Sequence, residues 1–84
     1  MIVQKTVRLI YSAHLLDQPL IHGLIRQFDL LTNILEAQVS VQGGYLTVTL
    51  RGEQANADQG LDWIGSQGVQ AQILSEMGEE ALGS

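Results

Sequence analysis

The chain has 84 residues, of which 45% are hydrophobic and 15% charged, and it contains no cysteine. This length allows one domain, since domains usually have about 100–150 residues, and the hydrophobic content excludes an intrinsically disordered chain. Without cysteine there is no disulfide framework, iron–sulfur cluster, thiol catalysis or thiolate-bound zinc. Nine acidic against four scattered basic residues give a net charge of −5, which argues against nucleic-acid binding because phosphates require a basic patch.

Targeting and membrane segments are not evident. No stretch approaches the roughly 18 consecutive apolar residues of a membrane-spanning helix. The first five residues lack a basic stretch followed by a long apolar core, so we do not expect a signal peptide there. We therefore expect a cytoplasmic protein without a membrane span.

The first half of the chain predicts a strand and then a helix. Residues 2–12 alternate between apolar and polar side chains, with Lys5 and Ile10 as exceptions, which is typical of a half-buried strand. Asp17-Gln18-Pro19 predicts a helix start, because Asp can cap free N–H groups and Pro is tolerated in the first turn. The apolar residues that follow at helical spacing, before an end near Asp29, are Ile21, Leu24, Ile25 and Phe28.

A hairpin is predicted in the middle of the chain. Residues 33–41 and 45–51 both alternate, and Gln42-Gly43-Gly44 between them is typical of a tight turn because Gly adopts positive φ. The residues of the second strand that alternation places on the apolar side, together with Asn33, are Leu35, Ala37, Val39 and Val41.

A weaker helix is expected over residues 54–67, followed by a short alternating strand over residues 69–73. Gly60 and Gly65 each cost about 1 kcal/mol relative to Ala inside a helix, which suggests close packing against another element. Gly68 is expected to cap this helix at its C-terminal end.

The order of these elements, βαββαβ, predicts an α+β fold: a ferredoxin-like sandwich with a four-stranded antiparallel sheet and both helices on one face. Right-handed crossovers place the first and third strands in the centre and leave the second and fourth at the edges. Residues 1–74 are expected to form the domain and residues 75–84 an acidic flexible tail. The sheet face without helices is expected to carry Gln4, Thr6, Arg8, Ile34, Glu36, Gln38, Tyr45, Thr47, Thr49, Arg51, Gln70 and Gln72.

No catalytic site is predicted. His14 and His22 are eight positions apart and have no third ligand at metal-binding spacing, so we interpret them as solvated side chains. The serines have no nearby His with an orienting acid, and no nucleophile elbow, P-loop or dinucleotide fingerprint occurs. We therefore expect a protein that is not an enzyme and has no metal or cofactor.

Two side chains, Trp63 and Asn33, each leave two interpretations open, whereas Tyr45 has one. Trp63 either covers the flank of the core or anchors a partner. Tyr45 is expected on the open sheet face, where one aromatic beside Arg8 and Arg51 makes no stacking platform for RNA bases. Asn33 either satisfies local backbone groups or holds its amide at a sheet edge for a ligand.

The segment Asp17-Gln18-Pro19-Leu20-Ile21, followed by Asn33-Ile34-Leu35-Glu36-Ala37, resembles the NIL domain, which is named after such an Asn-Ile-Leu signature. The resemblance covers about residues 7–74. This family is best known as the C-terminal regulatory domain of methionine ABC-importer ATPases, and it implies the fold predicted above. It also implies paired domains that bind methionine near their interface, with Asn33, Ile34 and Leu35 as the ligand and dimer edge. The ATPase P-loop is missing, as are the cysteines of the ferredoxin to which other relatives are fused.

Three functions follow as hypotheses. The first is a sensor of methionine or a related amino acid that acts as a homodimer. The second is an adaptor whose sheet edge or open face binds another protein without a small ligand, and the third is an accessory subunit of an enzyme. An edge strand without Pro and with Glu36 as its one charge invites pairing, and the residues predicted for the dimer edge are Leu35, Ala37, Val39 and Val41.

Overall fold

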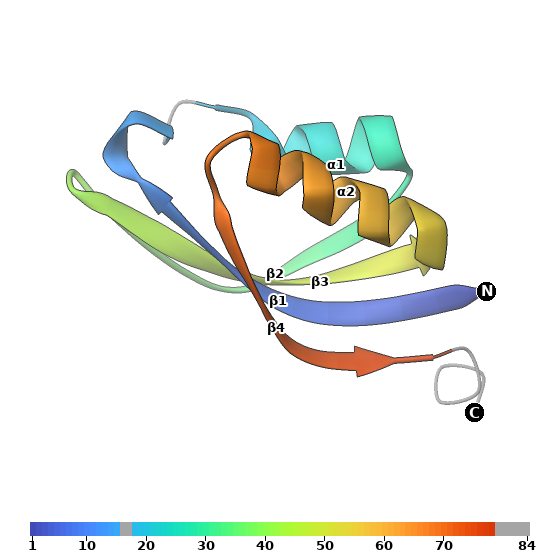
Figure 1. The fold of residues 1–84 in the computed structure, drawn as a ribbon. Coiled ribbons are helices and arrows are strands. Elements are labelled where there is room, and N and C mark those ends of the chain that lie inside the picture. The colour runs from blue at the N-terminus through green and yellow to red at the C-terminus, as the bar shows by residue number, and fades with distance from the viewer. Residues whose placement is uncertain (16–17, 79–84) are drawn as a thin grey trace.

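Within residues 1–15 and 18–78, which the structure describes, the computed structural model contains four strands and two α-helices (Figure 1). The elements in chain order are β1 (Ile2–Ser12), the 3₁₀ turn η1 (Ala13–Leu15), α1 (Leu20–Phe28), β2 (Leu31–Ser40), β3 (Gly43–Glu53), α2 (Gln54–Ser66) and β4 (Gln70–Met77). The sheet is antiparallel throughout, with the strand order β2-β3-β1-β4. The predicted ferredoxin-like fold, with the first and third strands in the centre, is confirmed.

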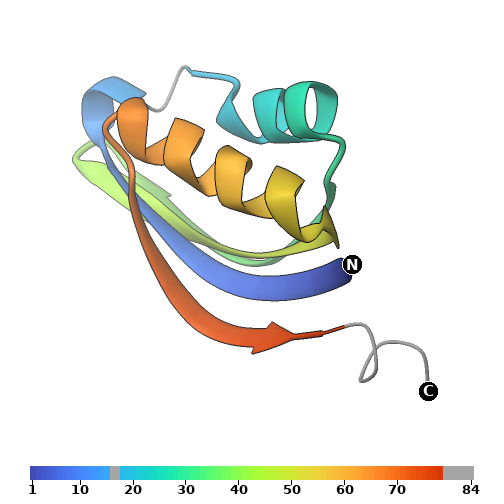
Figure 2. The ribbon, with the colours of Figure 1, turned by 45° about the vertical axis from the view of Figure 1, so that its right-hand side comes forward.

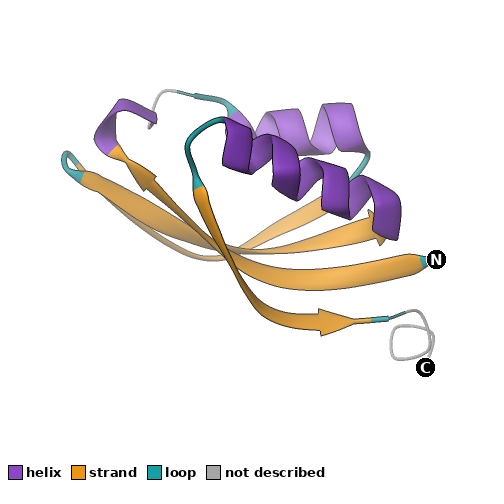
Figure 3. Cartoon of the chain, viewed as in Figure 1, coloured by secondary structure: helices purple, strands orange, loops and turns teal. Residues whose placement is uncertain are grey.

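Both helices lie on the same face of the sheet, as the two views in Figure 1 and Figure 2 agree. Among the described residues, no helix lies on the opposite face (Figure 3); we call it the open face. Cross-strand pairs place the side chains of Arg8 and Thr47 together on it, where the Arg8 Nε donates a hydrogen bond to the Thr47 hydroxyl at 3.2 Å. The open face therefore consists of polar side chains at its centre, as the alternation in β1 and β3 predicts.

The core lies between the helices and the sheet. Alternate residues of β1 point toward the helices because successive side chains of a strand face opposite sides. Two further core residues, Leu15 and Leu30, come from η1 and from the link between α1 and β2 rather than from a periodic segment. The buried apolar residues are Val3, Val7, Leu9, Leu15, Leu24, Leu30, Val48, Leu50, Ala57, Ile64 and Val69.

Lys5 is the charged exception on the helix-facing side of β1, where it is only 6% exposed. Its Nζ lies 3.1 Å from a carboxylate oxygen of Asp58 in α2 and 3.1 Å from one of Glu76 in β4. Burial alone lowers the pKa of Lys5, but the hydrogen bonds and negative charges of Glu76 and Asp58 outweigh it and raise the pKa above its ordinary value of 10.5. The Lys5 ammonium thus remains charged and joins α2 to β4 across β1.

The two helices touch closely at a glycine. A Cβ added to Gly23 of α1 would overlap Cη2 of Trp63 in α2 and lie 3.0 Å from its Cζ3. Trp63 also contacts Phe28 with ring centroids 5.7 Å apart, so this tryptophan packs between the helices, as expected for a side chain covering the flank of the core. Gly60 is closely packed too, because its added Cβ would lie 3.0 Å from a Leu30 methyl, whereas Gly65 has nothing within 4 Å.

The ends of the helices agree only in part with those predicted from the sequence. α1 begins at Leu20 and is followed by Asp29 in the left-handed conformation; the expected cap, Asp17, lies outside the described residues. Gly68 caps α2 as predicted. It has φ of +92°, and the N–H groups of Gly68 and Val69 donate to the carbonyl groups of Gly65 and Ile64, which is a Schellman motif.

The turn of the hairpin differs from the prediction. Ser40 pairs with Gly43, so the turn consists of Val41 and Gln42, and both predicted turn glycines belong to β3. Gly43 is required there for another reason: it has φ of +128°, and an added Cβ would lie 2.7 Å from the carbonyl oxygen of Tyr11.

The last strand is longer than predicted. β4 extends through Met77, because Ser75, Glu76 and Met77 pair with β1 after a register shift. The predicted boundary after residue 74 is therefore wrong for these three residues, since the shift breaks the alternation by which the strand was recognised. Residues 79–84 of the expected tail lie outside the described residues.

Candidate functional site

The candidate site is the free side of β2, the outer strand next to β3. We call this side, over Leu31–Ser40, the β2 edge. In the part of the chain that the structure describes, β2 pairs with β3 alone, so half of its backbone donors and acceptors remain open to another strand. The apolar side chains there are unusually exposed: Ile34 by 55%, Leu35 by 60% and Val39 by 57%.

A β-bulge in β2 changes which face the signature residues occupy. Ile34 pairs with Val48 and Glu36 with Thr47, so Leu35 is an additional residue on β2. Because Val48 lies in the core, Ile34 is on the helix-facing side and not on the open face, where alternation places it.

Asn33 changes sides for the same reason. It pairs with Thr49, which shares the open face with Thr47, so Asn33 lies on the open face. The prediction that it shares the apolar side with Leu35 and Ala37 is wrong, because it assumes unbroken alternation across the bulge. The Asn33 side chain is exposed, and among the described residues it has no hydrogen-bond partner, so its amide can both donate and accept.

The four residues predicted for the dimer edge do not all lie on one side of β2. Ala37 and Val39 pair with Leu46 and Gly44 and lie on the helix-facing side of β2. Leu35 lies at the bulge. Val41 is 90% exposed but lies in the hairpin turn, beyond the end of β2, so it does not belong to the edge strand.

The open face beside the β2 edge carries a network that joins three strands. The Tyr45 hydroxyl in β3 donates a hydrogen bond to the Glu36 carboxylate in β2, and the Arg8 guanidinium of β1 lies 4.7 Å from the centre of the Tyr45 ring. The hydrogen bond to Glu36 is the largest cause of the raised pKa of Tyr45, to which desolvation and the charge of Glu36 add, while Arg8 opposes it. Arg8 thus covers the one aromatic ring predicted for this face.

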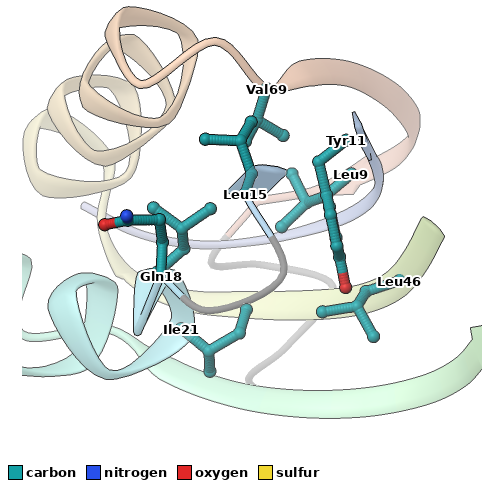
Figure 4. A pocket seen from close by; sticks show the side chains of 8 residues that line it. Leu9, Tyr11, Leu15, Gln18, Ile21, Leu46 and Val69 are labelled. Carbon is teal, nitrogen blue, oxygen red and sulfur yellow. The ribbon is translucent and has the colours of Figure 1, made fainter. Parts of the chain in front are cut away.

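Two hollows lie away from the signature residues. The first lies between the sheet, η1 and the start of α1 (Figure 4). The second lies between the two helices; its lining residues are Gln18, Pro19, Leu20, His22, Gly23, Gln27, Trp63 and Gln67. Neither hollow is lined by Asn33, Ile34 or Leu35, so a ligand at the signature would need a second surface to enclose it.

The histidines do not meet. His14 Nδ1 lies 2.9 Å from the Ser12 hydroxyl, and His22 is exposed on α1. No cluster of three or more His, Cys, Asp or Glu residues suited to a metal ion occurs among residues 1–15 and 18–78. In the same residues, no helix has the length and apolar character to cross a membrane.

Comparison with known proteins supplies the family. Residues 5–73 match the family model described as the NIL domain. The chain is 33% identical over 75 residues to methionine import ATP-binding protein MetN 1 of Enterococcus faecalis, covering 84% of this chain and 21% of the relative. It is 37% identical over 73 residues to the protein of the same name in Paraburkholderia xenovorans, covering 82% of this chain and 21% of the relative. The chain thus spans about one fifth of the length of these relatives.

A solved structure has the same fold. It is the C-terminal domain of an ABC transporter ATP-binding protein from Enterococcus faecalis, with a TM-score of 0.76, 19% identity, and coverage of 84% of this chain and 83% of that one. At this identity the likeness supports the architecture alone.

Proposed function

The chain belongs to the NIL domain family, and on this premise we propose that it is a small regulatory domain that senses methionine or a related amino acid at a homodimer interface in the cytoplasm. The names of its relatives, methionine import ATP-binding proteins, support the ligand class. Because the chain matches about one fifth of those relatives, and its solved counterpart is described as a C-terminal domain, we propose a regulatory rather than a catalytic role.

The exposed β2 edge is the observation that carries the proposal. Two copies that pair antiparallel along β2 would form one continuous eight-stranded sheet through a self-complementary, two-fold contact. Ile34, Leu35 and Val39 are each more than half exposed, and covering one such side chain contributes about 1 kcal/mol. Six of them in a dimer give about 6 kcal/mol, whereas association costs about 4–15 kcal/mol. Strand hydrogen bonds must therefore contribute as well, and we expect a dimer of modest affinity.

Asn33, Ile34 and Leu35 are the residues we propose for the ligand. The Asn33 amide can donate to the carboxylate of an amino acid and accept from its ammonium group. Ile34 lies on the opposite face of β2 from Asn33, so a pocket that uses all three residues must wrap around the exposed β2 edge. There a second copy could close Ile34 and Leu35, which are both exposed, over the ligand side chain. Neither of the two hollows in the described part of the chain is lined by these residues, so the proposal requires the dimer.

The dimer is tested by placing a charge on one edge strand and then on the other. Val39→Lys should give a monomer by light scattering, because it puts an ammonium group on the proposed contact. Ile73→Lys is the matched control: Ile73 is 54% exposed on the helix-facing side of the other edge strand, β4, and its variant should remain a dimer. A wild-type monomer at high protein concentration, or a Val39→Lys dimer, would contradict the proposed interface.

The ligand is tested by thermal unfolding across a panel of amino acids. A ligand at about 100 times its Kd adds roughly 2.7 kcal/mol to the free energy of unfolding. Methionine should raise Tm for the wild type but much less for Asn33→Ala. Gln38→Ala is the control, since Gln38 is exposed on the open face of the same strand. If methionine raised the Tm of Asn33→Ala as much as that of the wild type, Asn33 would not belong to the ligand site.

A protein-interaction adaptor is the second candidate. The unpaired backbone of the β2 edge would accept a strand of another protein as readily as a second copy. No helix of residues 1–15 and 18–78 covers the open face (Figure 3). A domain that shows no Tm shift with any amino acid would favour this function. Val39→Lys would then abolish capture of the partner without changing the stability of the isolated domain.

A further inference from the structure

The bulge at Leu35 brings a carboxylate to the same face of the sheet as Asn33. In a regular strand, side chains three positions apart lie on opposite faces, so Glu36 would point away from Asn33. Because Leu35 is an additional residue, Asn33 pairs with Thr49 of β3, while Glu36 pairs with Thr47 of the same strand. Both side chains therefore lie on the open face, as successive neighbours along β2 roughly 7 Å apart.

A guanidinium lies on the other side of Asn33. Arg51 of β3 pairs with Leu31 of β2 and with Gln4 of β1, so it shares the open face and is a diagonal neighbour of Asn33. Diagonal neighbours in an antiparallel pair are roughly 7–8 Å apart, a distance that long side chains can span. Asn33 thus has a positive charge toward the start of β2 and a negative charge, that of Glu36, toward its end.

Both charged groups can still bind a ligand. Arg51 is exposed and forms no ion pair among residues 1–15 and 18–78. The next open-face carboxylate of β3, that of Glu53, lies 2.7 Å from the N-terminal ammonium of Met1. Glu36 accepts the hydrogen bond of Tyr45 through one carboxylate oxygen, and a carboxylate has two oxygens with about four acceptor sites.

We propose that Arg51 and Glu36 bind the two charged ends of the amino acid. The Arg51 guanidinium binds the carboxylate of the ligand and the Glu36 carboxylate binds its ammonium group, with the Asn33 amide between them. This inference rests on the function proposed above, and it adds the two full charges that an amide lacks. The site then selects a zwitterion, because a ligand without one of its charges leaves Arg51 or Glu36 without a partner once a second copy covers the edge.

The test compares methionine with two analogues that each lack one charge, by NMR titration of the full chain. Methioninol has a hydroxymethyl group in place of the carboxylate, and the hydroxy analogue of methionine has a hydroxyl in place of the ammonium. Arg51→Gln should raise the Kd for methionine about three- to tenfold, but it should not raise the Kd for methioninol, which has no carboxylate. Glu36→Gln should raise the Kd for methionine to a similar extent, but not the Kd for the hydroxy analogue.

Arg26→Gln and Asp62→Asn are the matched controls. They remove the same charges from exposed side chains of α1 and α2, which lie on the other side of the sheet, so both should keep the Kd of the wild type for methionine. The inference is overturned, while sensing through Asn33 stands, if Arg51→Gln or Glu36→Gln binds methionine as the wild type does. An equal loss in the controls, or an equal loss for methionine and both analogues, would also overturn it. A wild-type domain that does not bind methionine would overturn the proposed function as well.

Discussion

Replacing Gly23 by Ala tests how closely the two helices pack. The backbone of α1 at Gly23 lies against the indole of Trp63, and an added Cβ would overlap Cη2 and lie 3.0 Å from Cζ3 and 3.2 Å from Cζ2. Favourable carbon–carbon contacts are about 3.5–4.0 Å. The indole must therefore move, although it is also held by Phe28, or the helices must separate.

Two opposing terms set the size of the effect. Ala is about 1 kcal/mol more favourable than Gly inside a helix. Overpacking a well-packed core costs about 1–3 kcal/mol, and the overlap at Gly23 places this cost in the upper half of that range. We expect Gly23→Ala to lower the free energy of unfolding by about 1–2 kcal/mol in urea denaturation followed by circular dichroism. For a domain of this size, each 1 kcal/mol corresponds to about 4–8 °C in Tm.

Gly65→Ala is the matched control. Gly65 also lies within a helix, but a Cβ added there has no atom within 4 Å. The variant therefore keeps the helix-propensity gain without the overlap, and it should be more stable than the wild type by about 0.5–1 kcal/mol.

A double-mutant cycle isolates the contact between Gly23 and Trp63. Trp63→Leu removes all three ring atoms that the Cβ would meet, so in that background Gly23→Ala should be neutral or stabilising. The coupling free energy should be about 1–3 kcal/mol, as for residues in direct contact. The reasoning is refuted if Gly23→Ala stabilises the wild type as Gly65→Ala does, or if its cost is the same with Leu at position 63.

Three other predictions concern a cap and two titrating groups. Gly68→Ala should destabilise the domain by about 1–2 kcal/mol in urea unfolding, because φ of +92° is unfavourable for a residue with a Cβ; unchanged stability would contradict this. The raised pKa of Lys5 means that its contribution to stability is complete below its ordinary pKa of 10.5 and is lost as the pH rises through the higher folded value. Unfolding measured between pH 9 and about 12 should show this loss, and Glu76→Gln should reduce it. Glu36→Gln should lower the pKa of Tyr45 in an NMR titration, since the hydrogen bond to Glu36 is the main cause of the raised value; an unchanged pKa would argue against that bond.

The sequence predicted β1 and β3 well because their alternation is regular. Val7 and Leu9 face the core and Arg8 faces the other side, and the neighbouring strand β3 pairs with β1 without a register shift. In β2 the prediction from alternation failed at Leu35, which is an additional residue in the strand. Because of it, the residues before Leu35 face the opposite side of the sheet from the one that alternation with the later residues predicts. The composition of β2 does not indicate the bulge, because Leu35 is as compatible with a regular strand as with an irregular one.

Contacts between residues far apart in the chain could not be predicted from the sequence, for a different reason. Lys5 stood out as an irregularity in β1, but its partners Asp58 and Glu76 lie more than 50 positions away. Gly23 carries no signal of its own, since its requirement comes from Trp63 in another helix. The hollow beside η1 could not be predicted either, because residues as far apart in the sequence as Leu9, Leu46 and Val69 line it.

Local periodicity alone determined the number, kind and order of the elements, and from the order came the ferredoxin-like fold with β2 as an outer strand. Those features depend on which side chains within a segment are apolar, and that information is present in each segment. The side of the sheet on which Asn33 lies and the burial of Lys5 were decided by the tertiary structure. Each depends on a neighbour that folding brings from elsewhere in the chain, and a shift of one residue between paired strands is enough to move a side chain from one face to the other.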